Sequence, residues 1–227
     1  TAKKLLARQV LDEDEDSEVL LKATDGITGS EANALRVIVE ELARPEARDP
    51  KLDAVRYFLL EHRTDKKTWL EHGCIVFSQY YDTAKWIGEQ LAVALPDEPI
   101  GVYAGAGKSG LFKGGAFAAV DRNDLKEAVK RREVRLLVAT DAACEGLNLQ
   151  TLGTLINVDL PWNPSRLEQR LGRIKRFGQA RKSVDMLNLV YQGTRDEDVY
   201  RVISQRMKDK YDIFGGLPDA IEDDWID

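Results

Sequence analysis

Short apolar runs alternate with amphipathic segments along most of the chain. The apolar runs are Cys74 to Phe77, Pro99 to Tyr103, Val134 to Ala139, Leu155 to Val158 and Val184 to Val190. Helical spacing predicts helices from Pro50, from Asp82 as an N-cap, over about 123–132, over Pro164 to Ile174, and after Thr194. Because the strands are nearly all apolar and are separated by helices, this pattern is typical of an α/β fold with a parallel sheet covered by helices on both faces.

The ends of the chain differ from this central part. Residues 1–48 carry an apolar helical stripe that includes Val37 and Ile38, and they are predicted to form a helical lead-in segment. Acidic blocks lie at 12–16 and 222–224, and residues 214–227 are predicted to form an acidic tail. We interpret these blocks as solvated surface, with an acidic arm that competes with phosphate as the alternative.

Composition excludes several classes of protein. The chain has 227 residues, of which 43% are hydrophobic and 32% charged, so it is neither disordered nor collagen-like. Its two cysteines, Cys74 and Cys144, form no CxxC pair and have no partnering histidines, which excludes a zinc site or a disulfide framework. No apolar stretch approaches the roughly 20 residues of a membrane span, and no secretory signal is recognisable. We therefore expect a cytoplasmic protein without a membrane partner, and we interpret the threonine start as an excerpt from a longer chain.

Polar residues directly follow four of the predicted strands. They are Ser78-Gln79, the glycine-rich loop from Ala104 to Gly115, Thr140-Asp141, and the segment Asp159 to Asn163. Ligands of open parallel sheets bind outside the carboxyl ends of the strands. We therefore expect these four loops to meet at one edge of the sheet.

The glycine loop contains Gly107-Lys108-Ser109, which resembles the end of a phosphate-binding P-loop. The pattern also requires a glycine where Val102 stands, and a helix directly after the serine, where further glycines follow instead. No apolar strand ends in Asp-Glu-x-Asp or Asp-Glu-x-His to hold magnesium. A flexible loop is the favoured interpretation, and a self-sufficient P-loop NTPase that uses Lys108 remains the alternative.

A basic helix carries the strongest chemical signal. The net charge of the whole chain is −6, but residues 163–182 hold seven basic residues against a single glutamate, a local charge of +6. Arg173 and Arg176 are three apart on one helical face, with Gln169 and Arg170 one turn earlier. Such a cluster favours an anion, and arginine donors match the oxygens of a polyphosphate. The alternative is an ordinary basic helix that is exposed to solvent and binds no ligand.

The segment Gln169 to Gln179 resembles motif VI of superfamily 2 helicases, most nearly the Swi/Snf-type ATPases and their bacterial RNA-polymerase-associated relatives. The segment Ala139 to Gln150 resembles motif V, Ile75 to Gln79 resembles motif IV, and Asp159 to Pro164 resembles the segment before motif VI. The similarity covers about Lys51 to Asp209 in the same order. It implies a RecA-like second motor lobe at 49–213, with 1–48 as a lead-in or inter-lobe segment.

The resemblance also implies the chemistry of the site. ATP with Mg would lie between this lobe and an N-terminal RecA-like lobe of the same protein, which would supply the P-loop and the magnesium ligands. Motif VI implies that Arg176 is the arginine finger toward the γ-phosphate, that Arg173 is its neighbouring phosphate contact, and that Gln169 helps to shape the cleft. Motif V implies that Gly146 and Asn148 approach the nucleotide. We expect Arg173 and Arg176 to face the carboxyl edge without unrelated carboxylate partners, and we expect the isolated lobe to be inactive.

The same resemblance implies contacts with nucleic acid. The residues concerned are Ser78, Gln79, Gly105 and Thr140. At Gly105 the family's hydroxyl-bearing neighbour is replaced by Ala104, so only the backbone could contact phosphate there. The expected partner is double-stranded DNA, bound without sequence preference. An RNA helicase lobe and a non-catalytic nucleic-acid-binding module are the alternatives.

Overall fold

The computed structural model describes residues 28–42, 44, 48–105, 107–144, 149–175, 179, 181 and 183–214. Side chains are described up to residue 206, except that of Leu42. The two acidic blocks lie outside these residues. None of the helices in the described part is long and apolar enough to cross a membrane.

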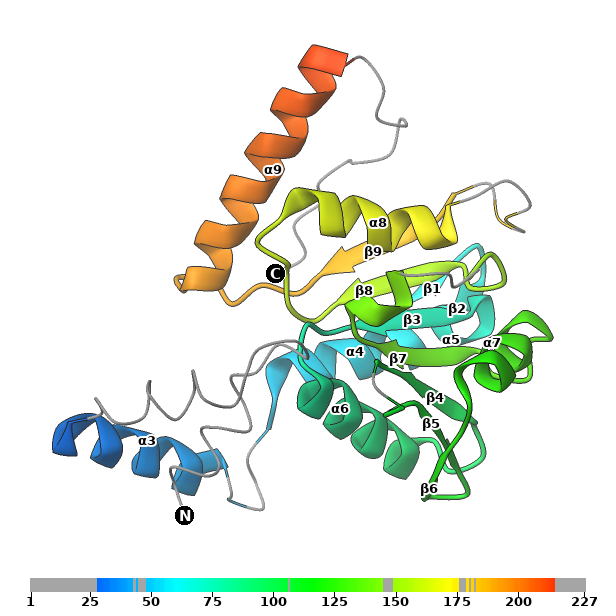
Figure 1. Cartoon of the computed structure of the whole chain (residues 1–227), viewed down its shortest axis with the longest axis horizontal. Coiled ribbons are helices and arrows are strands. Elements are labelled where there is room, and N and C mark those ends of the chain that lie inside the picture. Colours follow the sequence, from blue (N-terminus) through cyan, green and yellow to red (C-terminus); the bar gives the residue numbers. More distant parts are fainter. Residues whose placement is uncertain are drawn as a thin grey trace.

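A seven-stranded sheet forms the centre of the domain (Figure 1). Its strands are β3 (Cys74–Phe77), β4 (Ile100–Tyr103), β5 (Gly110–Lys113), β6 (Ala116–Ala119), β7 (Leu136–Ala139), β8 (Thr154–Asn157) and β9 (Asp185–Asn188). The strand order is β6-β5-β4-β7-β3-β8-β9. All five predicted strands are present and run parallel to their neighbours, whereas β5 and β6 form an antiparallel extension at one edge.

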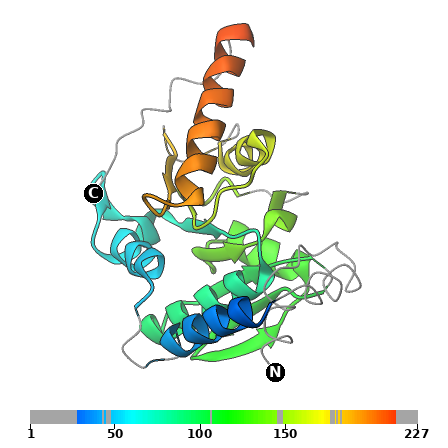
Figure 2. The same cartoon turned by 90° about the vertical axis from the view of Figure 1, so that its left-hand side faces the viewer.

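Helices cover both faces of the sheet, as the apolar strands predict. On one face, α4 (Pro50–Leu60) and α6 (Tyr81–Ala94) pack over Cys74 and Val76. On the other face, α7 (Arg122–Lys130), the 3₁₀ helix η1 (Asp141–Cys144) and α8 (Pro164–Ile174) pack with Ile75 and Phe77. The last helix, α9 (Arg195–Phe214), stands beside α8 at the β9 end of the sheet (Figure 2). The alternation of neighbouring residues of β3 between the two cores is the period-2 geometry of a strand.

Local sequence signals set the starts of two helices. Asp49 caps α4 by accepting from the backbone N–H of Leu52, and Asn163 caps α8 in the same manner, with proline in the first position of each helix. The prediction that Asp82 caps α6 is wrong. The helix begins earlier, with Tyr80 as the N-cap, because the N–H of Ala84 already donates to the Tyr80 carbonyl. Asp82 instead lies in the first turn, where its charge favours the helix dipole.

The glycine-rich loop differs most from the prediction. Much of it forms a hairpin of β5 and β6, whose two-residue turn is Gly114-Gly115 with φ values of 58° and 78°. Positive φ at both positions is what a tight hairpin turn requires, and glycine adopts it without strain. Gly110 allows the Phe117 ring to cross its backbone, because a Cβ there would lie 2.2 Å from the ring. These glycines therefore specify sheet structure rather than a flexible loop.

A short hairpin and a helix precede β3. The strands β1 (Arg63–Thr64) and β2 (Lys67–Thr68) pair antiparallel, and α5 (Trp69–His72) follows at once. Thr68 begins α5 with a reciprocal capping box to Glu71. This part of the fold was not predicted, and it lies at the amino edge of the sheet.

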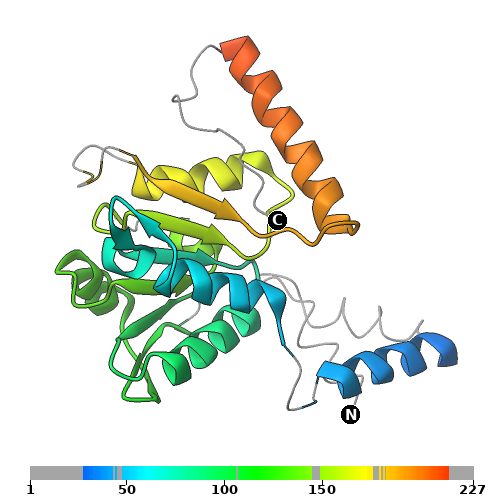
Figure 3. The same ribbon diagram turned by 180° about the vertical axis from the view of Figure 1, so that it is seen from behind.

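The predicted lead-in helix is present in part as α3 (Gly29–Leu42). Its apolar stripe does not join either core, since Val37 and Ile38 are 56% and 53% exposed. Figures 1 and 3 show α3 apart from the sheet. The helical spacing thus predicted the helix but not its packing.

Candidate functional site

The loops after the parallel strands meet at the carboxyl edge, as predicted. The Asp159 carboxylate, which follows β8, accepts from the Ser78 hydroxyl at 2.6 Å and from the Gln79 backbone N–H at 2.7 Å. The N–H of Thr140 donates to the Tyr103 carbonyl and joins the ends of β7 and β4. The segments that resemble motifs IV and V therefore lie on one surface.

The four residues expected to contact nucleic acid occupy different environments. Ser78 is fully buried and its hydroxyl is committed to Asp159, so it positions this carboxylate instead of presenting a surface to a ligand. Gln79 is half-buried, and its amide donates to the Leu160 carbonyl. Gly105 is half-buried in a turn closed by the Lys108 N–H. The Thr140 hydroxyl is buried and has no hydrogen-bond partner in the described part of the chain.

Arg170 is buried at the centre of this edge. Its Nε donates to Asp141 at 2.6 Å, and its Nη1 donates to the Asn157 side chain at 2.8 Å. Its guanidinium also lies 4.9 Å above the centre of the Phe77 ring. One side chain from α8 thus holds η1, β8 and β3 together. Arg170 was predicted to belong to the phosphate-binding cluster, and the structure corrects this because its guanidinium is fully buried and its Nε and Nη1 donate to internal acceptors.

Burial makes this network rigid, but it also removes charged groups from water, which costs free energy. Burial raises the pKa of the Asp159 carboxyl, while the Ser78 hydrogen bond and the charge of Arg170 oppose that rise. The Nη2 of Arg170 lies 4.0 Å from Asp159 and has no hydrogen-bond partner among the described residues. Such a network depends on all its members, because removing one leaves a buried charge without compensation.

Arg173 lies in the last turn of α8, beside the segment that resembles motif V. Its carbonyl accepts from the Leu149 N–H at 3.3 Å, and η1 packs against α8. Burial raises the pKa of the Cys144 thiol to about 11, Asp141 adds to the rise, and the charges of Arg170 and Arg173 oppose it. Arg173 therefore lies on the part of α8 that packs beside η1 and the segment after it.

Arg173 does not lie at the carboxyl edge itself. The helix α8 starts at that edge and runs back toward the amino edge, where Gln179 donates to the Ile174 and Leu152 carbonyls. Arg173 is one turn further from the carboxyl edge than Arg170, contrary to the expectation of a single edge site. It forms no ion pair with a carboxylate of the described residues.

The remaining predicted nucleotide contacts are only partly visible. Gln169 is exposed on α8, one turn before Arg173. Arg176, Gly146 and Asn148 lie outside the described residues. In the described part of the chain, no group of three histidine, cysteine or acidic side chains is placed to hold a metal ion.

The P-loop alternative does not fit the structure. The Ser109 side chain is buried, and its hydroxyl both donates to the Ala104 carbonyl and accepts from the Ala104 N–H. Lys108 lies 4.9 Å above the centre of the Tyr81 ring, and the chain continues into β5 rather than into a helix. A P-loop needs a free hydroxyl and a helix N-terminus at these positions.

Lys108→Ala is therefore expected to leave ATP binding unchanged within about twofold, because Lys108 contacts an aromatic ring and not a phosphate cradle. Equilibrium binding of a fluorescent ATP analogue to the full-length protein measures this. Lys113→Ala, on the neighbouring strand, is the matched control. Loss of binding in the Lys108 variant alone would restore the P-loop hypothesis.

The fold and the site define a class of protein. The sheet is mostly parallel and has helices on both faces, polar loops at its carboxyl edge and an arginine-bearing helix beside η1, which is a RecA-like arrangement. Residues 51–178 match the family described as the helicase conserved C-terminal domain. This match covers more than half of the chain, so the chain belongs to that family. The predicted resemblance to the C-terminal lobe of superfamily 2 helicases is confirmed.

Three curated proteins illustrate this relationship. The chain is 37% identical over 110 residues to the uncharacterized ATP-dependent helicase YqhH of Bacillus subtilis, which covers 48% of the chain and 19% of that protein. It is 40% identical over 67 residues to the RNA polymerase-associated protein RapA of Vibrio vulnificus, and the match covers 30% of the chain and 7% of that protein. It is 36% identical over 73 residues to the ATP-dependent RNA helicase DbpA of Bacillus subtilis, and the match covers 32% of the chain and 15% of that protein. The matches span a fifth or less of each relative.

A solved structure confirms the fold. The C-terminal part of the Fun30 ATPase domain superposes with a TM-score of 0.52 at 19% identity. The superposition covers 89% of this chain and 64% of that one.

Proposed function

We propose that this chain is the second motor lobe of an ATP-dependent nucleic-acid translocase or helicase. Residues 49–213 form this lobe and residues 1–48 lead into it. The observation that carries the proposal is the contact between Arg173 and Leu149, which holds the segment resembling motif VI against the segment resembling motif V. Both segments would face ATP held by a first lobe of the same protein.

The residues of the chain fit an anionic partner. Arg173 carries a positive charge beside η1 without a carboxylate partner among the described residues, and a triphosphate is complementary to it. ATP with Mg supplies the phosphoryl group for transfer, with the magnesium ligands in the first lobe. In this proposal Arg173 and Arg176 donate to the γ-phosphate oxygens, while Gly146, Asn148 and Gln169 hold the nucleotide.

The carboxyl edge would bind the nucleic-acid backbone. The Thr140 hydroxyl is buried without a partner among the described residues, and a phosphate oxygen would supply one. Gln79 and the backbone at Gly105 would add contacts, and Ser78 would act through Asp159. Contacts of this kind carry no base information, so binding would be independent of sequence and weaker at high salt.

We propose double-stranded DNA as the substrate, because Trp162-Asn163-Pro164 and Gly178-Gln179 resemble the Swi/Snf-type ATPases. RNA is the second candidate, since DbpA, which is similar over 73 residues, is an RNA helicase. Movement along a duplex requires no strand separation, and closure of the two lobes around ATP would shift the grip on the backbone.

The shared cleft predicts that the 227-residue chain alone does not hydrolyse ATP, whereas the full-length protein does. The reason is that a lobe without a P-loop cannot hold the triphosphate. Phosphate release would be measured for both proteins with duplex DNA, with RNA and without nucleic acid. Turnover by the chain alone at the full-length rate would refute the shared cleft, and stimulation by RNA only would select the second candidate.

A further inference from the structure

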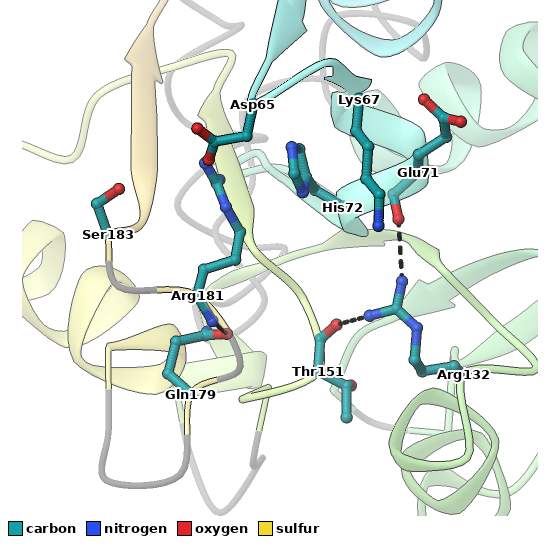
Figure 4. Close-up of a pocket in the computed structure, with 9 residues that line it drawn as sticks. All are labelled: Asp65, Lys67, Glu71, His72, Arg132, Thr151, Gln179, Arg181 and Ser183. Atoms are coloured by element: carbon teal, nitrogen blue, oxygen red, sulfur yellow. Dashed lines mark hydrogen bonds and ion pairs between the residues drawn. The ribbon is translucent and has the colours of Figure 1, made fainter.

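A polar pocket lies at the amino edge of the sheet, opposite the loops of the candidate site (Figure 4). It encloses about 730 Å³. The residues that line it are Asp65, Lys67, Glu71, His72, Arg132, Thr151, Gln179, Arg181 and Ser183. Most of them immediately precede a parallel strand or belong to the β1–β2 hairpin and α5. The pocket is therefore separate from the surface assigned to nucleic acid.

Two cations point into the same space of this pocket. Arg132 follows α7 with a φ of 59°, an uncommon conformation for a residue other than glycine. Its guanidinium donates to the Thr151 carbonyl at 2.6 Å and to the Glu71 carbonyl at 3.0 Å, which fixes its orientation. Lys67 reaches toward it from β2 (Figure 4). Neither side chain forms an ion pair with any carboxylate that the structure describes.

The acidic residues of the pocket are already committed. Asp65 accepts from Arg181 at 3.1 Å, and Arg181 is also bonded to Asp185. The Glu71 carboxylate accepts from the Thr68 N–H at 2.7 Å, and this hydrogen bond lowers its pKa. In Figure 4 that carboxylate points away from Arg132. Arg132 therefore has no carboxylate beside its guanidinium among the described residues, whereas Lys67 lies near enough to Glu71 for its charge to lower the pKa of that carboxyl.

We propose that this pocket binds the phosphate group of a phosphorylated ligand. The fixed Arg132 guanidinium and the movable Lys67 ammonium supply charge-assisted donors from two sides, which is the chemistry that recognises phosphate. The Ser183 hydroxyl lies across the pocket from these two cations, beyond Arg181, and would be a neutral donor for another part of a larger ligand (Figure 4). The volume exceeds that of inorganic phosphate and lies within the range of small-molecule sites, so a nucleotide fits. This site goes beyond the motor function and does not depend on it.

The test is a titration of the ¹⁵N-labelled chain, followed by backbone amide chemical shifts. Inorganic phosphate, adenosine monophosphate and a short DNA duplex are added in turn at constant ionic strength. We expect phosphate and the nucleotide to shift amides of residues 65–72, 132 and 183. If the duplex shifts the same amides, the phosphate that binds here belongs to a nucleic-acid strand. If the duplex shifts none of them, the ligand is a small phosphorylated molecule.

Variants separate this site from the motor site. Lys67→Ala is expected to weaken phosphate binding at these amides about tenfold, the loss of one charge-assisted hydrogen bond. Lys130→Ala, an exposed lysine on α7 outside the pocket, is the matched control and should have no effect. Arg173→Ala should leave these shifts unchanged whether or not Arg173 serves ATP hydrolysis, because Arg173 does not line the pocket. Equal binding by the Lys67 variant and its control, or shifts that cluster elsewhere, would overturn the proposal.

Discussion

Arg173→Ala in the full-length protein is expected to lower ATP turnover by roughly 10³- to 10⁵-fold, the range measured for loss of an arginine finger. The reason is that Arg173 lies beside η1 without a carboxylate partner among the described residues, where it can neutralise charge on the γ-phosphate. Affinity for duplex DNA should stay within about twofold, because the DNA contacts are assigned to the carboxyl edge. Phosphate release and fluorescence anisotropy measure the two quantities on the same preparation.

Lys175→Ala is the matched control, since Lys175 is an exposed cation two residues further along the chain. It should change turnover by less than about threefold. The rival hypothesis of a non-catalytic basic module predicts the reverse pattern, in which the Arg173 variant loses DNA affinity while hydrolysis persists. That outcome would end the motor interpretation of α8.

Arg170→Met should have the largest effect on folding, lowering the free energy of unfolding by about 3–5 kcal/mol, because it leaves the half-buried carboxylates of Asp141 and Asp159 without their shared cation. Urea unfolding followed by circular dichroism measures the change. Since such a loss approaches the whole stability of many domains, Asp141→Asn is measured as well. It removes one charge but keeps an acceptor for Arg170, so we expect a smaller loss in the same direction.

Arg166 offers a control at the same carboxylate. It is 49% exposed on its side chain and lies 3.3 Å from Asp141. Exposed ion pairs contribute at most about 1 kcal/mol, so Arg166→Ala should be nearly neutral. Equal losses for the two arginine variants would show that Arg170 does not hold the edge together in the way described.

Strand and helix positions could be predicted well because their signals are local. Mostly apolar runs of four to seven residues are typical of strands in a sheet covered on both faces, and Asn163-Pro164 is a sufficient signal for the start of α8. Packing is not local, which is why the exposed stripe of α3 could not be foreseen. The same apolar spacing occurs in helices that pack against a core and in helices that do not.

The site was predicted less completely. Arg170 lies between Leu167 and Ile174 on the buried face of α8, so helical spacing contained a signal that it faces the core. Its partners Asp141 and Asn157 come from other elements, and only the fold brings them together. The β5–β6 hairpin was missed because Gly114-Gly115 was interpreted as flexibility rather than as a two-residue turn.

The Arg170 network has a mechanical consequence. Because one buried guanidinium fastens α8, η1 and the ends of two strands, this end of the domain cannot bend at a single loop without breaking several short bonds at once. A load applied to the loops after β3 or β8 would be passed to α8 through these contacts, so the carboxyl edge and α8 would move as one unit.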